Sequence, residues 1–229
     1  MGNIDNFPNV KVYAGPMASG KTRELHSLMG RFEATHRPYA AYKPSLDIRQ
    51  KGIQPRGVSE SDAFGCEIVD SLADIDAASL VSNGISTVML EEFHMFGYSL
   101  SREVLSNIFI ESIRHWGENG ITEVHAAGLD LAASLNPFPI FMDAWRFGAD
   151  ITLMPAYCEY PVLNGGPTCQ AIAHNSQIYS DWLGLAYRPE SLEDLLPQGD
   201  NPDRKYRAVC MAHLILPSEL TIDFIKEFN

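Results

Sequence analysis

Eight consecutive residues near the amino terminus have the types and spacing that bind a polyphosphate. They read GPMASGKT over positions 15–22 and fit the pattern G-x-x-x-x-G-K-[ST] at every fixed position. Glycines let backbone N–H groups turn toward phosphate oxygens, the lysine supplies positive charge, and the threonine hydroxyl can bind Mg²⁺. We expect phosphate contacts from Gly15, Met17, Ala18, Ser19, Gly20, Lys21 and Thr22.

A pair of acids is the second group that could do chemistry. Glu91 and Glu92 follow the apolar run 85–90, which is typical of a buried parallel strand. Beside a phosphate loop, such carboxylates hold Mg²⁺ and orient or deprotonate a nucleophile. The alternative is a strand that simply ends in solvated glutamates. Because adjacent strand residues point in opposite directions, we expect at most one of the two side chains to face the phosphates.

A third polar segment, 43–49, follows the strand-like residues 39–42. Its Asp47 and Arg49 would lie at the carboxyl end of a parallel sheet, where ligands bind in open α/β folds. There Arg49 could supply positive charge to a transferring phosphoryl group. An exposed ion pair within a loop is the alternative. His94, just after the acid pair, could touch the same site or have a purely structural role.

Three cysteines and a histidine toward the carboxyl terminus could bind a metal. Cys210 and His213 have a zinc-ligand spacing, and Cys158 and Cys169 would complete a tetrad. Ten residues separate Cys158 from Cys169, more than in the usual knuckle, so His174 could compete as a ligand. The alternative is that these cysteines are small buried apolar residues.

The elements that must position these residues alternate along residues 1–154, as in an α/β domain with a parallel sheet. We expect strands at 10–13, 39–42, 67–69, 85–90, 123–128 and 151–154, and helices at 23–35, 72–81 and 102–116. Residues 52–65 are polar, and we expect an irregular, mobile loop. The module at 155–216 is too small for a large apolar core, so a metal would stabilise it. Residues 217–229 fit an amphipathic helix.

Charge and hydropathy limit the classes of function. The 229 residues carry a formal net charge of −12, which argues against nonspecific binding to nucleic acid. No apolar run approaches the ~18 residues that cross a membrane, and the first residues lack a secretory pattern. The four cysteines read as thiols or metal ligands. We therefore expect a cytoplasmic protein that binds small molecules rather than nucleic acid or membranes.

Six blocks, in order along the chain, resemble the zinc-containing thymidine kinases. They are GPMASGKTREL (15–25), YKPSLDIR (42–49), LEEFHMF (90–96), AGLDLAASLNPF (127–138), the segment 149–158, and KYRAVCMAH (205–213). The resemblance implies a P-loop (RecA-like) α/β fold with helices on both faces of the sheet, and a small zinc-ribbon and lasso module. It also implies transfer of the ATP γ-phosphoryl group to the 5′-hydroxyl of thymidine or a related pyrimidine deoxynucleoside, with Mg²⁺ and structural Zn²⁺.

The resemblance further implies roles for individual residues. Glu92 would be the catalytic base, while Lys21 and Arg49 would act on the transferred phosphate. Thr22 and Glu91 would bind Mg²⁺. The substrate-binding positions would be Met17, Asp47, Phe96, Leu129, Ala133 and Tyr206, and the zinc ligands Cys158, Cys169, Cys210 and His213. The family commonly forms tetramers, so we expect a homo-oligomer, either a tetramer or a dimer.

The chain departs from the family where the base would be recognised. Ala133 stands at the position of an aromatic residue that stacks on the base, and Leu131 at that of a glycine. Phe93 and His94 replace an Ala-Gln pair after the acids. An aromatic stack contributes about 1–3 kcal/mol per base, so its loss should weaken thymidine binding or admit a larger base. The alternatives are a kinase of a modified pyrimidine deoxynucleoside and a catalytically weak nucleotide-binding relative.

Overall fold

The computed structural model describes residues 7–47, 52–96, 101–133, 135–160, 168–180, 185–186 and 204–216. The chain forms two compact units. The first is drawn from residues 1–14, 20–128 and 139–153, and the second from 15–19, 129–138 and 154–229. The phosphate loop is therefore divided, with its first five residues in the second unit. The domain boundaries expected at 154 and 216 stay predictions, and the expected helix at 217–229 lies outside the described residues.

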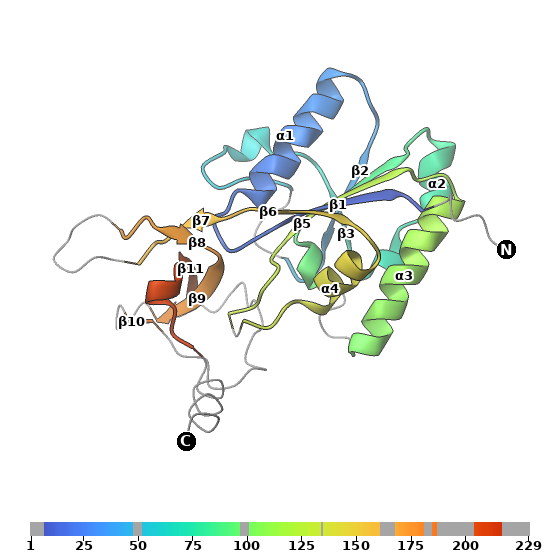
Figure 1. The fold of residues 1–229 in the computed structure, drawn as a ribbon. Coiled ribbons are helices and arrows are strands. Elements are labelled where there is room, and N and C mark those ends of the chain that lie inside the picture. Colours follow the sequence, from blue (N-terminus) through green and yellow to red (C-terminus); the bar gives the residue numbers. More distant parts are fainter. Residues whose placement is uncertain are drawn as a thin grey trace. The chain divides into compact units, whose positions relative to one another are not determined.

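A six-stranded parallel sheet forms the centre of the first unit (Figure 1). Its strands are β1 (Asn9–Ala14), β2 (Ala40–Pro44), β3 (Glu67–Val69), β4 (Thr87–Leu90), β5 (Glu123–Gly128) and β6 (Asp150–Leu153). They lie in the order β3-β2-β4-β5-β1-β6, and every neighbouring pair is parallel. The carboxyl ends of all six strands therefore share one edge, where ligands bind in open α/β sheets.

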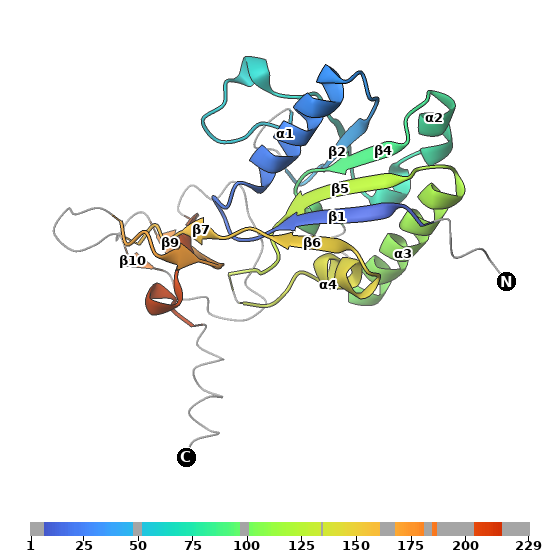
Figure 2. The same ribbon diagram turned by 45° about the horizontal axis from the view of Figure 1, so that its top comes forward.

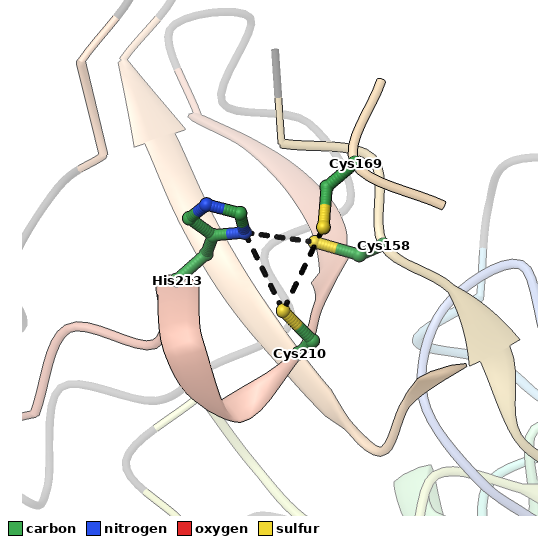
Figure 3. A group of neighbouring side chains, drawn as sticks. All are labelled: Cys158, Cys169, Cys210 and His213. Atoms are coloured by element: carbon green, nitrogen blue, oxygen red, sulfur yellow. Dashed lines mark hydrogen bonds between the residues drawn. The ribbon is translucent and has the colours of Figure 1, made fainter. Parts of the chain in front are cut away.

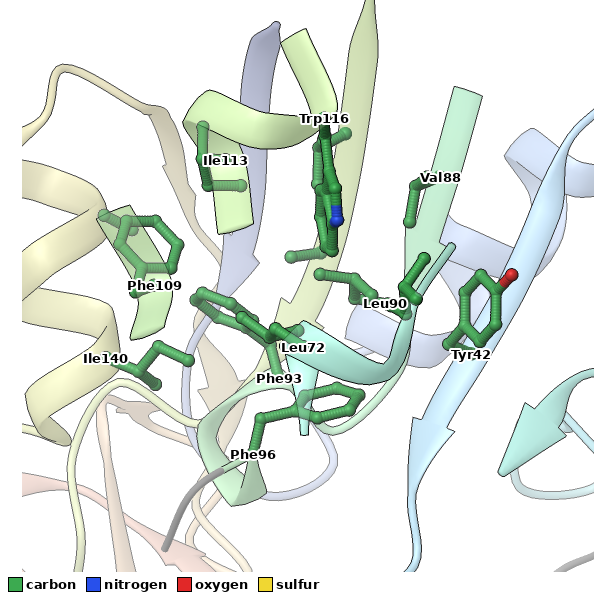
Figure 4. Packing of buried hydrophobic residues seen from close by; sticks show 14 of the residues in the cluster. Tyr42, Leu72, Val88, Leu90, Phe93, Phe96, Phe109, Ile113, Trp116 and Ile140 are labelled. Atoms are coloured by element: carbon green, nitrogen blue, oxygen red, sulfur yellow. The ribbon is translucent and has the colours of Figure 1, made fainter. Parts of the chain in front are cut away.

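Helices cover both faces of this sheet (Figures 1 and 2). One face carries α1 (Lys21–Ala34), and the other carries α2 (Ala77–Ser82), α3 (Arg102–Glu118) and α4 (Pro139–Arg146). Successive side chains of β4 point to opposite faces of the sheet, as in any strand. Met89 packs with α1, while Val88 and Leu90 pack with α3 (Figure 4). The expected α/β architecture is confirmed. No helix among the described residues has the length and apolar character needed to cross a membrane.

Two helices of the structure differ from the expected pattern. The expected helix 72–81 is two pieces, η3 (Leu72–Asp74) and α2. The break arises because Ser71 and Asp74 form a capping box, and Asp76 then caps a second start. The short helix α4 was not expected, although Pro139 at its first position suits a helix start.

The segment 52–65 is anchored to α1 rather than irregular throughout. Ile53 and Phe64 form an antiparallel bridge, and Ile53 is fully buried. The Phe64 ring lies 4.5 Å, centroid to centroid, from the ring of His26 on α1. Apart from this bridge and the turn at Glu60–Asp62, the segment is irregular, as expected. Two apolar side chains attach it to the core, and its expected mobility stays a prediction.

Short antiparallel strands build the second unit. They are β7 (Ala156–Tyr157), β8 (Ile172–Ala173), β9 (Asn175–Ser180), β10 (Leu185–Ala186) and β11 (Arg204–Val209), followed by the turn η5 (Met211–His213). β9 lies between β10 and β11, and β7 pairs with β8. Among the described residues, the buried side chains of the hydrophobic cluster around these strands are small, and the partly buried Tyr160, Cys169 and Leu214 pack against them; the buried ones are Ala156, Cys158, Ala173, Ala208, Val209 and Cys210. So small a cluster supplies little hydrophobic stabilisation.

Candidate active site

The phosphate loop leaves β1 in a backbone conformation that favours glycine. Gly15 has a φ of 150°, and a Cβ there would collide with the carbonyl oxygen of Met154. Gly20, with a φ of 90°, caps α1. Ala18 also has a positive φ, 60°, a region that costs an L-residue about 1–2 kcal/mol. The surroundings must therefore hold Ala18 in place.

α1 begins directly after the loop, as the motif requires. Lys21 is its first residue and is only 8% exposed. The first turn of a helix presents N–H groups without intrahelical acceptors, together with the positive end of the helix dipole. A glycine loop that leads into this turn is a suitable site for a phosphate group.

Thr22 and Glu91 join this helix to the sheet. The Thr22 hydroxyl donates a hydrogen bond to Glu91 Oε1 at 2.6 Å. Glu91 is 6% exposed, and its Oε2 is buried with no hydrogen-bond partner among the described residues. Burial, and next the charge of Glu92, raise the pKa of Glu91 to about 8. The Thr22 hydrogen bond and the Lys21 charge oppose that rise.

Glu92 has a different environment from its neighbour. β4 ends at Leu90, and Glu92 adopts a left-handed conformation (φ 50°, ψ 43°) before the turn η4 (Phe93–Met95). Its side chain is 17% exposed, and Oε2 lies 3.5 Å from Nδ1 of the buried His94. β4 ends at Leu90, so the strand alternation does not run over both acids. The expectation that at most one of them faces the phosphates stays a prediction.

Gly128, the last residue of β5, makes room for η4. A Cβ at Gly128 would lie 3.0 Å from the His94 backbone nitrogen and 3.1 Å from both His94 Nδ1 and the Phe93 backbone nitrogen. These distances are too short for an ordinary carbon contact. Sequence reasoning did not single out Gly128 for this reason, since the close approach joins segments far apart in the chain.

A buried ion pair lies at the carboxyl end of β2. Lys43 Nζ lies 3.4 Å from Asp47 Oδ2, and the two side chains are 1% and 7% exposed. The Asp47 charge makes a minor contribution to the raised pKa of Glu91. Lys43 was not predicted as a site residue, although a lysine in an apolar strand was a usable signal. Arg49 lies outside the described residues.

The residues expected to contact the base lie in both units. In the first unit, Phe96 is 1% exposed and packs in the large hydrophobic cluster (Figure 4). In the second, Ala133 is 6% exposed within a hairpin closed by a Leu131–Pro137 bridge, and Leu129 is half-buried. Tyr206 is half-buried on β11. Their roles toward a substrate stay predictions.

Sequence reasoning missed Ser176, which contacts the phosphate loop. The backbone N–H of Met17 donates a hydrogen bond to Ser176 Oγ at 2.8 Å. The two residues are 159 positions apart, so no local pattern connects them.

The expected cysteine–histidine group assembles in the second unit (Figure 3). One ligand atom from each of Cys158, Cys169, Cys210 and His213 lies within 4.8 Å of all the others. His213 Nδ1 is 3.6 Å from Cys158 Sγ and 3.4 Å from Cys210 Sγ, and the Cys169 and Cys210 sulfurs are 4.0 Å apart. Tetrahedral zinc would separate sulfur from nitrogen by about 3.6 Å and two sulfurs by about 3.8 Å. The group is therefore compatible with zinc.

Backbone pairing explains how the wide cysteine spacing still forms a compact group. The Cys158 N–H donates to the Ala171 carbonyl at 2.8 Å, and the Gln170 N–H donates to the Cys158 carbonyl at 3.1 Å. The chain therefore returns beside Cys158 after the intervening residues, and Cys169 joins the group, whereas His174 is exposed. The Tyr160 ring stacks on His213 with the centroids 4.1 Å apart.

Comparison with known proteins gives several related thymidine kinases. No family model matches this chain. A thymidine kinase of Thermococcus kodakarensis is 23% identical over 212 residues, covering 92% of this chain and 95% of that protein. One of Ureaplasma parvum serovar 3 is 24% identical over 226 residues, covering 96% and 91%. One of Bacteroides thetaiotaomicron is 29% identical over 150 residues, covering 65% and 68%. These relatives support the thymidine kinase family.

Proposed function

We propose that this chain is a deoxynucleoside kinase that transfers the ATP γ-phosphoryl group to the 5′-hydroxyl of thymidine or a related pyrimidine deoxynucleoside. The observation that carries the proposal is the contact between Thr22, at the start of the phosphate-loop helix, and Glu91, with Glu92 next along the chain. The thymidine kinases similar to this chain support the same chemistry.

The donor phosphates would bind the loop 15–22. Backbone N–H groups and the first turn of α1 would hold phosphate oxygens, and Lys21 would place its charge beside the outer phosphates. Arg49, which lies outside the described residues, is proposed on the family resemblance alone to add charge near the transferred group.

The residues at the end of β4 fit a divalent cation such as Mg²⁺. The unpartnered Glu91 Oε2 and the Thr22 hydroxyl are hard oxygen ligands of the kind that Mg²⁺ prefers. Burial, and next the charge of Glu92, raise the pKa of Glu91, so a bound cation would favour its charged form. When bound, the cation would neutralise charge on the transferring phosphates.

Glu92 is the proposed general base. Its carboxylate, more exposed than that of Glu91, would accept the proton of the 5′-hydroxyl as the 5′-oxygen bonds to the γ-phosphorus. The bond from the γ-phosphorus to the β–γ bridging oxygen then breaks, and ADP leaves with that oxygen. His94, against Glu92 Oε2, would hold the carboxylate in position.

The residues that would bind the acceptor base are proposed from the family resemblance. Met17, Asp47, Phe96, Leu129, Ala133 and Tyr206 are proposed to bind the nucleoside by their match to family positions. A small buried residue at Ala133, where the family has an aromatic ring, favours a second candidate, a kinase of 5-substituted pyrimidine deoxynucleosides. A catalytically weak nucleotide-binding protein is the further alternative.

The metal in the second unit is proposed to be structural zinc, which would assign the chain to the zinc-containing type. A closed Cys₃His set leaves no open position for a substrate, and the surrounding hydrophobic cluster is small. The cytoplasmic location and a homo-oligomeric assembly stay predictions.

Turnover on a nucleoside panel tests this function. We expect the purified protein, with ATP and Mg²⁺, to convert thymidine, deoxyuridine or a 5-substituted deoxyuridine to its 5′-monophosphate. Glu92→Gln keeps the shape of the side chain but cannot take a proton, so we expect at least about a 100-fold loss of kcat. Glu111→Gln, on the exposed side of α3, is the matched control. Absence of turnover on every pyrimidine deoxynucleoside would refute the proposal.

The same panel separates the alternatives. Preference for 5-substituted bases over deoxyuridine supports the modified-base kinase, and equal rates oppose it. ATP binding without any acceptor-dependent ADP release identifies the weak nucleotide-binding relative.

A further inference from the structure

β9 contacts the phosphate loop through one buried hydroxyl. Ser176 is 2% exposed, and its Oγ accepts the Met17 N–H at 2.8 Å. Met17 immediately precedes Ala18, whose positive φ must be maintained by its surroundings. The Ser176 hydrogen bond therefore helps to set the shape of the loop.

The two neighbours of Ser176 contact a different segment. Asn175 Nδ2 lies 3.6 Å from Met211 Sδ, and Gln177 Oε1 accepts the Ile215 N–H at 3.1 Å. These contacts are made to η5 and the residues just after it. Successive strand side chains point to opposite faces. One face of β9 therefore contacts η5 and the residues after it, and the other face contacts the phosphate loop.

β9 is also connected to the cysteine–histidine group through the strand that pairs with it. It pairs with β11 from Ser180–Arg204 to Asn175–Val209, and β11 leads directly into Cys210. Cys169 comes shortly before β8 and β9 in the chain. Since the hydrophobic cluster around these strands is small among the described residues and includes two of the cysteines, a bound metal would restrain β9.

We propose that metal binding at the cysteine–histidine group and ATP binding at the phosphate loop are thermodynamically coupled through Ser176. The inference rests on the proposed function, because it takes the loop as the ATP site. With metal bound, β9 keeps Ser176 within hydrogen-bonding distance of Met17, and the loop keeps the conformation that binds phosphate. Without metal this anchor is lost, and ATP must order the loop itself. Coupling of this kind is reciprocal, so ATP tightens metal binding by the same factor.

Calorimetric titration with ATP tests the coupling on the full chain. One titration uses zinc-loaded protein, and the other uses protein stripped with a chelator and desalted, both with Mg²⁺ present. One net hydrogen bond corresponds to about a 3- to 10-fold change in affinity, and we expect ATP to bind the stripped protein more weakly by about that factor. A dye competition for zinc, with and without ATP, should give the same factor.

Variants of Ser176 separate coupling from general unfolding. Zinc-loaded Ser176→Ala should keep its zinc but bind ATP as weakly as the stripped wild-type protein, with no further loss on stripping. Ser176→Thr keeps the hydroxyl and suits a strand, so it should keep the wild-type behaviour. Ser82→Ala, which removes an exposed hydroxyl on α2, is the matched control.

Each outcome decides the proposal. Equal ATP affinity with and without zinc overturns the coupling, and so does zinc-loaded Ser176→Ala that binds ATP like the wild type. If the stripped protein unfolds, the comparison of the two zinc-loaded proteins still decides. Failure of ATP to bind any form refutes the proposed function instead.

Discussion

At the scale of residues, the two adjacent acids Glu91 and Glu92 differ in burial, backbone conformation and hydrogen-bonding partners. Glu91 is buried against Thr22 and has a pKa raised to about 8. Glu92 is more exposed, has left-handed backbone dihedrals and lies against His94. Strain of this kind on a non-glycine residue is common where function requires a fixed position. The environments therefore favour a cation at one acid and proton transfer at the other.

His94 gives a residue-scale prediction. His94→Ala should lower kcat by about 10-fold, because the Glu92 carboxylate loses a positioning contact, while the KM for ATP stays unchanged. His94→Gln, whose amide can still donate to the carboxylate, should recover most of the loss. Steady-state kinetics with thermal melts measures both. An unchanged kcat in a folded His94→Ala protein would remove His94 from the mechanism.

At the scale of elements, the end of β5 determines where η4 can lie. At Gly128 the backbone of η4 approaches so closely that a Cβ would have contacts of 3.0–3.1 Å, tighter than nearly all real Cβ contacts. The acid pair comes from the loop between β4 and η4, so a glycine on a neighbouring strand sets the position of the proposed base.

Substitution of Gly128 tests this relation. Gly128→Ala should destabilise the protein by about 1–3 kcal/mol, because its Cβ meets backbone atoms that cannot move cheaply, and it should lower kcat as η4 shifts. Gly65→Ala, where a Cβ meets nothing within 4 Å, is the control and should leave both quantities nearly unchanged. Urea denaturation and kinetics provide the measurements. A Gly128→Ala protein with wild-type stability and kcat would contradict this account.

At the scale of the whole molecule, a cluster of charged side chains away from the acid pair makes the free energy of unfolding depend on pH. Arg37 and His125 lie 2.9 Å and 3.2 Å from the two oxygens of Glu123. Burial lowers the pKa of His125 from 6.5, although Glu123 opposes the shift. Burial alone would raise the pKa of Glu123, but Arg37 and His125 outweigh it and lower the pKa from 4.5.

These directions predict that His125 and Glu123 stabilise the fold less in acid. Both folded pKa values are depressed, so the unfolded chain binds protons first as the pH falls. The contributions of His125 and Glu123 to the free energy of unfolding should therefore be steady above about pH 6.5 and decrease below it, first that of His125 and then, below about pH 4.5, that of Glu123. The raised pKa of Glu91 acts in the opposite direction, so the difference between the wild type and a His125 variant isolates the histidine. Urea denaturation across this range measures the effect. His125→Gln should flatten the first part of the decrease, and an unchanged profile would exclude His125 as its source.

The second unit gives a further whole-molecule prediction. Stripping the metal should expose the backbone amides of β9 and β11 to hydrogen exchange, because the remaining hydrophobic cluster is small. The amides of β1, β4 and β5 should stay protected, since large clusters cover both faces of their sheet. Exchange detected by mass spectrometry, with metal analysis of the same sample, measures both. Retained protection of β9 without metal would oppose a structural role for it.

The sequence alone determined the phosphate loop, the alternation of strands and helices, and the residue types of the acid pair and metal group. These features are local, because adjacent residues set backbone turns and periodic patterns set helices and strands. It did not determine the Thr22–Glu91 contact, the close approach at Gly128, the return of Cys169 beside Cys158, or the Ser176–Met17 hydrogen bond. Each of these joins residues far apart in the chain, so only strand order, register and tertiary packing could bring them together.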